Sequence, residues 1–240
     1  MNYLKDRVWF IDEIRGVAIV LMVIYHAAFD LIFFFGVRLD LFSCDSVNLL
    51  RDFFAGLFIF ISGVSCKFSS NNVKRGFKCL ACGLGITVIT YIFFKEYAIY
   101  FGILHMLGLS MILYGLFKNF LSKIKFPTLG IIISGLLFGL SRSVLPLPFG
   151  LRSDFGRWMF WLGGFSEGSS AFDYFPLLPW IFVFLAGTFF GVFAIEHRLP
   201  NFFYNRHSRM IAFIGRKTLL IYLLHQPVIY ALLYLFFNHL

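Results

Sequence analysis

Charged residues are scarce in this chain of 240 residues. Asp, Glu, Lys and Arg make up 14% of it, whereas 60% is hydrophobic. Soluble domains usually carry about 25% charged residues, so these few charges cannot cover a water-facing surface. Among the apolar residues are 35 Phe, many in unbroken runs such as residues 31–35. A helix built from such runs is apolar on every face, which is typical of a segment surrounded by lipid.

Cysteine is also rare, and the four copies are scattered at Cys44, Cys66, Cys79 and Cys82. The last two form a lone C-x-x-C at the start of an apolar segment. A structural metal site or a redox site needs further partner residues, and the sequence offers none in a recognisable pattern. We therefore interpret the cysteines as small, buried hydrophobic residues.

Apolar segments long enough to cross about 30 Å of hydrocarbon recur along the chain. They lie near residues 9–36, 50–69, 77–95, 98–117, 127–144, 174–195 and 211–237. This pattern predicts an all-α, polytopic integral membrane protein of about seven transmembrane helices, forming a single domain over residues 1–240. The first segment carries internal charges and has no small-residue cleavage site, so a cleaved signal peptide is not expected. Residues 144–174 are expected to lie at the interface or to re-enter the membrane.

The net charge of +9 is distributed between the apolar segments and does not form one patch. No nucleic-acid-reading helix or base-stacking module is visible, so nucleic-acid binding is not expected. With the N-terminus inside, fifteen of the 21 Lys and Arg fall on the inner side and six outside, among them Arg38 and Arg51. Because cytoplasmic loops carry the excess of basic residues, we predict an inside N-terminus and an outside C-terminus in the cell membrane.

One face of the first segment carries four ionisable residues: Asp12, Arg15, His26 and Asp30. At about 100° per residue, positions 12 and 30 point the same way, and positions 15 and 26 lie within about 60° of them. Ionisable groups inside a membrane helix are costly and need a function or a partner. Arg15 and His26 are about 16 Å apart along the axis, so a long polar ligand or a set of partner residues must follow this stripe.

Each pair in the stripe has a structural and a functional interpretation. Asp12 and Arg15, three residues apart, can form an ion pair at the inner interface. The spacing of His26 and Asp30 lets the carboxylate accept a hydrogen bond from one ring nitrogen, which leaves the other as a general base. The same two residues could instead be a buried structural pair.

Histidines in two other segments reach a depth similar to that of His26. These are His105 and His225, the latter followed by Gln226 and a proline that should kink its helix and expose carbonyl groups. Polar groups converging at one depth predict a shared cavity. Three imidazoles and Asp30 could also bind zinc, but no paired histidine motif supports this, and no metal is expected.

A second group of interest begins the last segment, where Arg216 and Lys217 follow Gly215. Together with Arg15, Lys74, Arg75 and Lys78, these residues could form a basic rim that binds a phosphate-bearing molecule, since Arg and Lys are suited to phosphate. Most other basic residues on the inner side are explained by topology alone.

The first segment resembles the opening of a known family. Residues 8–16 and the stretch from His26 to Asp30 are similar to the heparan-α-glucosaminide N-acetyltransferase catalytic-domain family, in its short bacterial form, within the wider transmembrane acyltransferases. Three further stretches fit: residues 58–63, residues 178–180 with Gly187, and residues 215–227. The order and spacing of these motifs carry the resemblance.

The resemblance implies an acyl-CoA donor, with acetyl-CoA expected, taken from the cytoplasm, and a glycan or amino-sugar acceptor on the far side of the bilayer. It implies His26 as the catalytic histidine and Arg15 near the donor. The hypothesis makes His26 a general base or a transiently acylated residue, and Asp30 orients it. Asp12 and Arg216 are placed at the donor. Four residues support the cavity: His105, Tyr222, His225 and Gln226. The animal enzymes are longer and have a lumenal domain, so heparan is not carried over as the substrate.

Two rival functions stay open at this point. A transporter or flippase could use the same cavity, although no inverted repeat is visible. A non-catalytic membrane subunit would need the polar residues only for stability. The sequence leaves open the acceptor, the acyl length, O- or N-acylation, and whether the chain acts alone or as a homo-oligomer.

Overall fold

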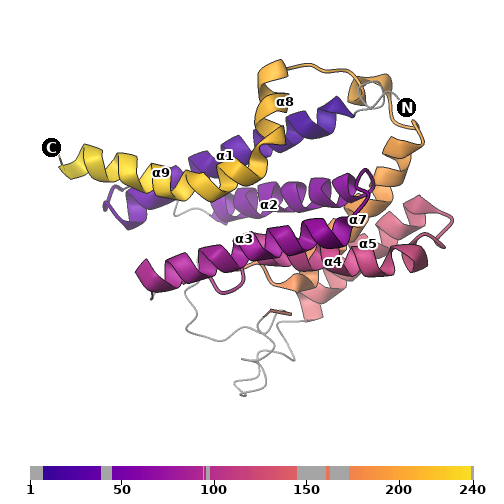
Figure 1. The fold of residues 1–240 in the computed structure, drawn as a ribbon, viewed down its shortest axis with the longest axis horizontal. Coiled ribbons are helices and arrows are strands. Elements are labelled where there is room, and N and C mark those ends of the chain that lie inside the picture. Colours follow the sequence, from indigo (N-terminus) through magenta and orange to yellow (C-terminus); the bar gives the residue numbers. More distant parts are fainter. Residues whose placement is uncertain are drawn as a thin grey trace. The chain divides into compact units, whose positions relative to one another are not determined.

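The computed structural model describes residues 8–38, 45–93, 95, 98–144, 161–162 and 173–238. These residues form eight α-helices and one short 3-10 helix, η3 (Figure 1). The helices are α1 (Trp9–Phe33), α2 (Asp45–Cys66), α3 (Asn72–Phe93), α4 (Ile103–Leu121), α5 (Pro127–Val144), α7 (Leu177–Ile195), α8 (Arg209–Arg216) and α9 (Thr218–Asn238), with η3 (Asn201–Phe203) before α8.

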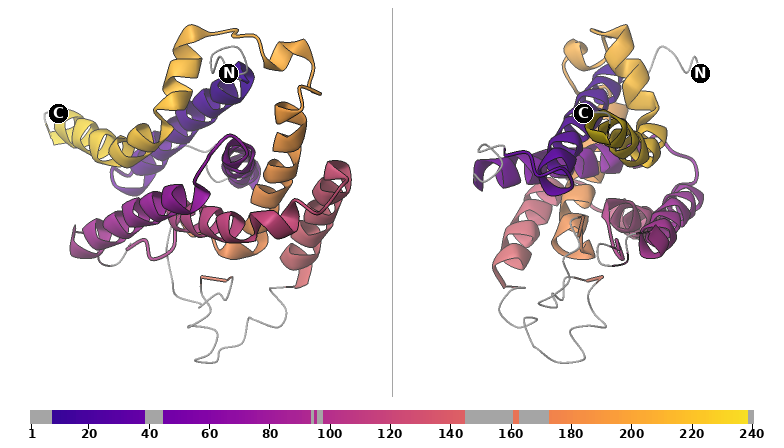
Figure 2. Two further views of the ribbon diagram at one scale, coloured as in Figure 1. Left: turned by 45° about the vertical axis from the view of Figure 1, so that its right-hand side comes forward. Right: turned by 90° about the vertical axis from the view of Figure 1, so that its left-hand side faces the viewer.

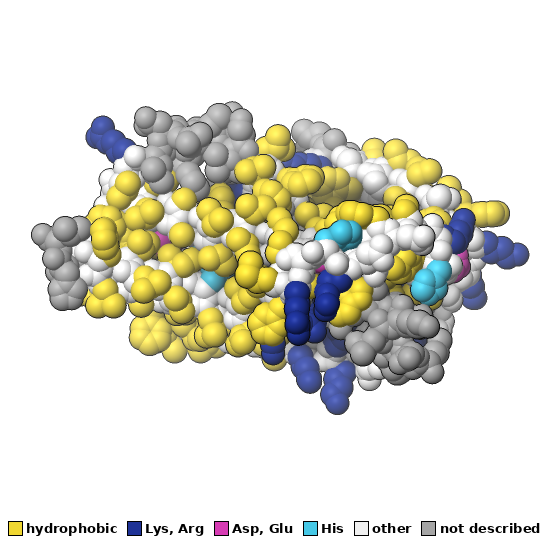
Figure 3. Space-filling model, turned by 90° about the horizontal axis from the view of Figure 1, so that it is seen from above, with side chains coloured by type: hydrophobic (Ala, Val, Ile, Leu, Met, Phe, Trp, Pro, Cys, Tyr) yellow, Lys and Arg dark blue, Asp and Glu magenta, His cyan; other side chains and the backbone are white. Residues whose placement is uncertain are grey.

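Six of these helices are long and apolar enough to cross a membrane: α1, α2 from Leu49 onward, α3, α4, α7 and α9. This confirms an all-α chain with several membrane-spanning helices. Helix α5 matches the fifth predicted segment, but its apolar stretch is shorter than those of the other six. Apolar side chains, in yellow, spread over the surface seen in Figure 3, whereas Lys and Arg occur in a few groups. Most of residues 144–174, where an interfacial segment was predicted, lies outside the described residues.

The last predicted segment, residues 211–237, is not one helix. Helix α8 ends at Arg216 and the chain leaves helical geometry at Lys217, where φ is −104° and ψ is 13°. Helix α9 then follows in a different direction (Figure 1) and continues through Pro227. The change of direction therefore falls at Lys217, because α8 is held across α1 by contacts that the hydropathy pattern does not contain.

The described chain divides into two compact units. Residues 1–58 and 198–240 form the first, and residues 59–197 form the second. Within the first unit, α8 crosses α1 near its beginning, and α9 runs alongside the second half of α1 in the same direction (Figures 1 and 2). Aromatic ring contacts confirm that α1 and α9 run in parallel. His26 contacts His225 in the second half of α1, and Phe35, just after α1, contacts Phe237 at 4.8 Å between centroids.

A reciprocal pair of glycines brings α1 and α8 together. A Cβ added at Gly215 would collide with the main-chain oxygen of Asp12, and one added at Gly16 would collide with that of Ile211. Small residues let helix backbones approach closely, which is how membrane helices commonly associate. Both glycines belong to stretches that carry the family resemblance, so these stretches include a packing requirement.

The second unit uses the same device between the second part of α2 and α7. A Cβ at Gly63 would meet the carbonyl oxygen of Phe184, and a Cβ at Gly187 would meet that of Phe60. A further reciprocal glycine pair joins α3 and α4. Close glycine crossings therefore hold helices together in both units.

Candidate functional site

The stripe on α1 begins with the predicted ion pair. Nη1 of Arg15 lies 3.5 Å from Oδ1 of Asp12, and Asp12 is buried. Gly16 and Gly215 lie against each other's helices, so Arg15 and Arg216 are each next in sequence to a glycine of this crossing. The prediction that Asp12 and Arg15 pair is confirmed.

Further along α1, His26 faces α9. The rings of His26 and His225 lie 4.9 Å apart between centroids at an angle of 60°. Nδ1 of His225 lies 2.6 Å from the carbonyl oxygen of Tyr222. Because a carbonyl only accepts, Nδ1 is the donor, and Nε2 of the neutral ring keeps its lone pair. The structure thus brings together two of the three histidines that the sequence placed at one depth.

Asp30 has a different partner from the one expected. Its side chain is fully buried, and Nε2 of Gln226 donates to Oδ1 at 2.7 Å and to Oδ2 at 2.8 Å. No hydrogen bond joins Asp30 to His26, so the predicted pairing within α1 is wrong. The spacing on one helix permits that contact, but a side chain from the neighbouring helix reaches the carboxylate instead. Oε1 of Gln226 is buried and has no hydrogen-bond partner among the described residues.

His105 lies in the second unit, where both of its ring nitrogens are engaged. Nδ1 accepts a hydrogen bond from the main-chain N–H of Gly102 at 3.2 Å. The hydroxyl of Thr87 donates to the carbonyl of Ile99 at 2.6 Å, so it accepts from Nε2 of His105 at 3.2 Å. The ring therefore serves the N-terminus of α4, and its part in a shared cavity stays a prediction.

Arg216 and Lys217 lie at the end of α8, and both side chains are exposed. The guanidinium of Arg216 lies over the ring of Phe213, 5.7 Å from its centroid. An exposed basic pair at a helix C-terminus is available to an anion in solution, as the predicted basic rim requires.

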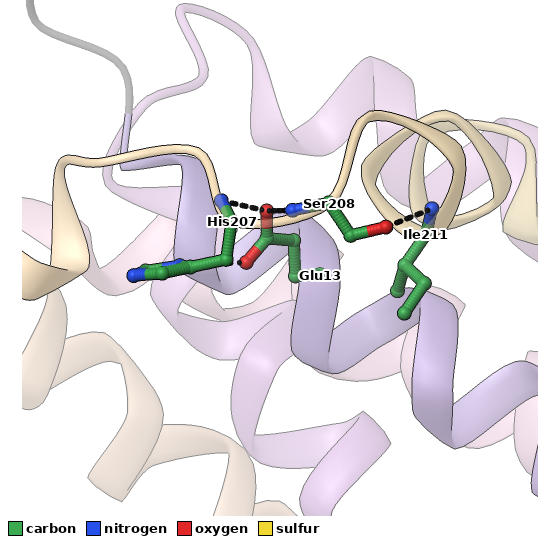
Figure 4. A network of polar contacts seen from close by, with 4 residues as sticks. All are labelled: Glu13, His207, Ser208 and Ile211. Atoms are coloured by element: carbon green, nitrogen blue, oxygen red, sulfur yellow. Dashed lines mark hydrogen bonds and ion pairs between the residues drawn. The ribbon is translucent and has the colours of Figure 1, made fainter.

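Glu13 is a site residue that the sequence analysis missed. Its buried Oε1 accepts hydrogen bonds from the main-chain N–H groups of His207 and Ser208, both at 2.7 Å (Figure 4). Its Oε2 lies 3.0 Å from Nδ1 of His207, and the Ser208 hydroxyl caps α8 by accepting from the N–H of Ile211 at 3.3 Å. Glu13 therefore fixes the start of α8. The only signal in the sequence was an acid inside an apolar segment, because its partners lie 194 and 195 residues away.

Arg51 is the second residue that the sequence did not single out. It was counted as an outer-side charge, and it lies on α2 near the beginning of the candidate span Leu49–Cys66. Its Nε and Nη2 lie 3.1 Å and 2.9 Å from Oδ1 of Asp52. A side-chain hydrogen bond also joins Arg51 to Tyr25, the neighbour of His26.

Among the described residues, no group of three His, Cys, Asp or Glu side chains is placed to hold a metal ion. The comparison with curated proteins and that with solved structures both gave no match. The model of one protein family, described as heparan-alpha-glucosaminide N-acetyltransferase, catalytic, matches residues 7–227. This match extends from the start of α1 to Pro227 in α9 and includes every residue of the stripe. The chain therefore belongs to the heparan-alpha-glucosaminide N-acetyltransferase catalytic family.

Proposed function

We propose that this chain is a membrane-embedded acyltransferase that moves an acetyl group from cytoplasmic acetyl-CoA to a sugar or glycan acceptor outside the cell membrane. Family membership suggests acyl transfer. The observation that carries the assignment to residues is the meeting of His26 and His225 beside the buried Asp30–Gln226 pair. Ionisable groups gathered inside membrane helices are expensive and usually functional.

The proposed topology has seven spans, with the N-terminus inside and the C-terminus outside. Helices α1 and α9 run in the same direction in the first unit (Figures 1 and 2). If both cross the bilayer, the chain must cross it an odd number of times. Six helices qualify by length and composition, and α5 supplies the seventh. The excess of basic residues on the inner side supports the same orientation.

In the proposed chemical step, His26 acts as the general base. One ring nitrogen accepts the proton of the acceptor hydroxyl or amine while the acceptor oxygen or nitrogen attacks the thioester carbonyl carbon. The carbon–sulfur bond then breaks, and the leaving sulfur of CoA takes the proton from His26. The acetyl group ends on the acceptor, and CoA leaves as the thiol.

The neighbours of His26 have positioning roles in this proposal. Asp30 binds Gln226, the residue after His225, and so fixes the register of α9 on α1. His225 is held by the carbonyl of Tyr222 and presents its ring to His26. A catalytic imidazole needs such restraint because small displacements of a reacting group reduce the rate strongly.

The donor is assigned to the opposite end of the stripe. Arg15 and Arg216 would bind phosphates of CoA, and Asp12 restrains Arg15. The rise of α1 separates Arg15 from His26 by about 16 Å, which suits an extended pantetheine arm between the phosphates and the thioester.

The test replaces His26 by Ala in membranes containing the full chain and measures transfer of labelled acetyl from acetyl-CoA to membrane glycans. We expect transfer to fall by at least about a hundredfold, the usual contribution of a general base. Ile24→Ala is the matched control, since Ile24 is 58% exposed on the same helix, and it should retain transfer. Undiminished transfer by His26→Ala would overturn the proposal.

A further inference from the structure

A second polar cluster lies next to His26, on the side of α1 that faces α2 in the first unit. The Arg51 guanidinium is bound to Asp52 through two nitrogens and also hydrogen-bonds Tyr25. The rings of Tyr25 and His26 are 5.7 Å apart between centroids. This chain of contacts connects an ion pair on α2 to the proposed catalytic histidine.

The cluster lies inside the apolar part of the unit. Arg51 falls within the span that begins at Leu49, and Tyr25 is about 12 Å from the end of α1, by the rise per residue. The Arg51 side chain is 38% exposed and that of Asp52 is 23% exposed. Arg51 and Asp52 are neighbours on one helix, so their ion pair does not itself join α1 to α2. Charged residues within an apolar span need a function or a partner.

The charges of the cluster constrain what it can bind. Asp52 neutralises the guanidinium, so the pair attracts no anion strongly. A guanidinium has five N–H donors; the contacts with Asp52 use two of them, so donors remain for Tyr25 and for a ligand. A group that fits is uncharged and accepts hydrogen bonds.

On the α9 side of His26 lies a complementary group. Oε1 of Gln226 is buried without a hydrogen-bond partner among the described residues, and buried polar atoms normally have one. Gln226 adjoins His225, whose ring touches that of His26. His26 is therefore flanked by hydrogen-bond donors at Arg51 and by a buried acceptor at Gln226, a combination that suits hydroxyl groups, which both donate and accept.

We infer that Tyr25, Arg51 and Gln226 form the acceptor subsite and that the acceptor is an uncharged, hydroxyl-bearing sugar. This inference rests on the proposed function, and it narrows the acceptor class by excluding sugar acids and sulfated or phosphorylated sugars. Asp52 is a specificity determinant, because it cancels the charge that would otherwise favour an anionic sugar. Tyr25 positions the guanidinium beside His26.

The test measures binding of two probes, methyl glucoside and methyl glucuronide, to the purified full-length protein in lipid nanodiscs. Wild type should bind the glucoside more tightly. Arg51→Gln should weaken glucoside binding about tenfold, as expected for loss of a charge-assisted hydrogen bond. Asp52→Asn should shift the ratio of the two affinities about tenfold toward the glucuronide. Arg38→Gln is the control, since Arg38 is an exposed arginine outside the spans of the same unit.

Acetyl-CoA binding provides the internal reference and should stay within twofold of wild type in every variant. Tyr25→Phe is a second test of the inference if Asp52→Asn does not fold. It keeps the ring and removes the hydroxyl, so it should weaken binding of the glucoside and leave acetyl-CoA binding unchanged. Tighter binding of the glucuronide by wild type, unchanged sugar affinities in Arg51→Gln, or an equal loss of acetyl-CoA binding would overturn the inference. A protein that binds the glucoside through Arg51 but transfers no acetyl would contradict the proposed function and leave this sugar site standing.

Discussion

The buried carboxylate of Asp30 depends on a single side chain from another helix. Among the described residues, Gln226 donates both hydrogen bonds to this carboxylate, and a buried polar group left without a partner is costly. The spacing of His26 and Asp30 in the sequence suggested a contact within α1, since helical periodicity relates residues on one helix. Helical periodicity contains no information about a partner 196 residues away.

The Asp30–Gln226 contact predicts a particular pattern of stabilities. Gln226→Leu should lower the free energy of unfolding by about 2 kcal/mol, because it leaves the Asp30 carboxylate buried without a donor. The double variant Asp30→Leu with Gln226→Leu should recover more than half of that loss, since no polar group then stays unpaired. Reversible unfolding in mixed micelles measures both values. A double variant less stable than Gln226→Leu would show that the pair is not the source of the effect.

At the scale of elements, the orientation of α8 explains why one predicted helix is two. Glu13 holds the main chain at His207 and Ser208, and the Gly16–Gly215 crossing holds the other end against α1. Apolar residues lie on both sides of the charged Arg216 and Lys217. This short interruption of the hydropathy pattern did not by itself show that the chain changes direction at Lys217. The six long apolar helices and the Asp12–Arg15 pair were predictable, because runs of apolar residues and a spacing of three residues are local features.

The glycine crossing predicts opposite effects for the same substitution at different places. Gly16→Ala and Gly215→Ala should each lower the free energy of unfolding by about 2 kcal/mol, because the added methyl collides with main-chain oxygen and overpacking is costly. Gly135→Ala on α5 meets no atom within 4 Å and should be stabilising by about 0.5 kcal/mol, since alanine favours a helix over glycine. Thermal unfolding of the three variants decides this, and equal effects at all three positions would refute the packing account.

At the scale of the whole molecule, the orientation of the chain in the membrane is the property to test. The parallel course of α1 and α9 and the distribution of basic residues both point to an odd number of spans. The sequence could support this only through loop charges, whereas the structure adds the direction of two helices in one unit (Figure 1).

Single cysteines test this topology. In a chain whose four native cysteines are replaced by serine, Arg38→Cys, after α1, should react with a membrane-impermeant maleimide added to intact cells. Arg206→Cys, before α8, should react only after the cells are opened, because it lies on the cytoplasmic side. Both residues lie in described, non-spanning parts of the first unit. Labelling of Arg206→Cys in intact cells would show that the orientation is the opposite of the one proposed.

The most direct test of the central claim is transfer across a sealed bilayer. Purified protein is reconstituted into vesicles that enclose the acceptor methyl glucoside, and labelled acetyl-CoA is added outside. For molecules whose cytoplasmic face points outward, we predict labelled sugar inside the vesicles with wild type and at least about a hundredfold less with His26→Ala. Equal labelling by the two proteins, or label that stays on acetyl-CoA with both, would contradict the account.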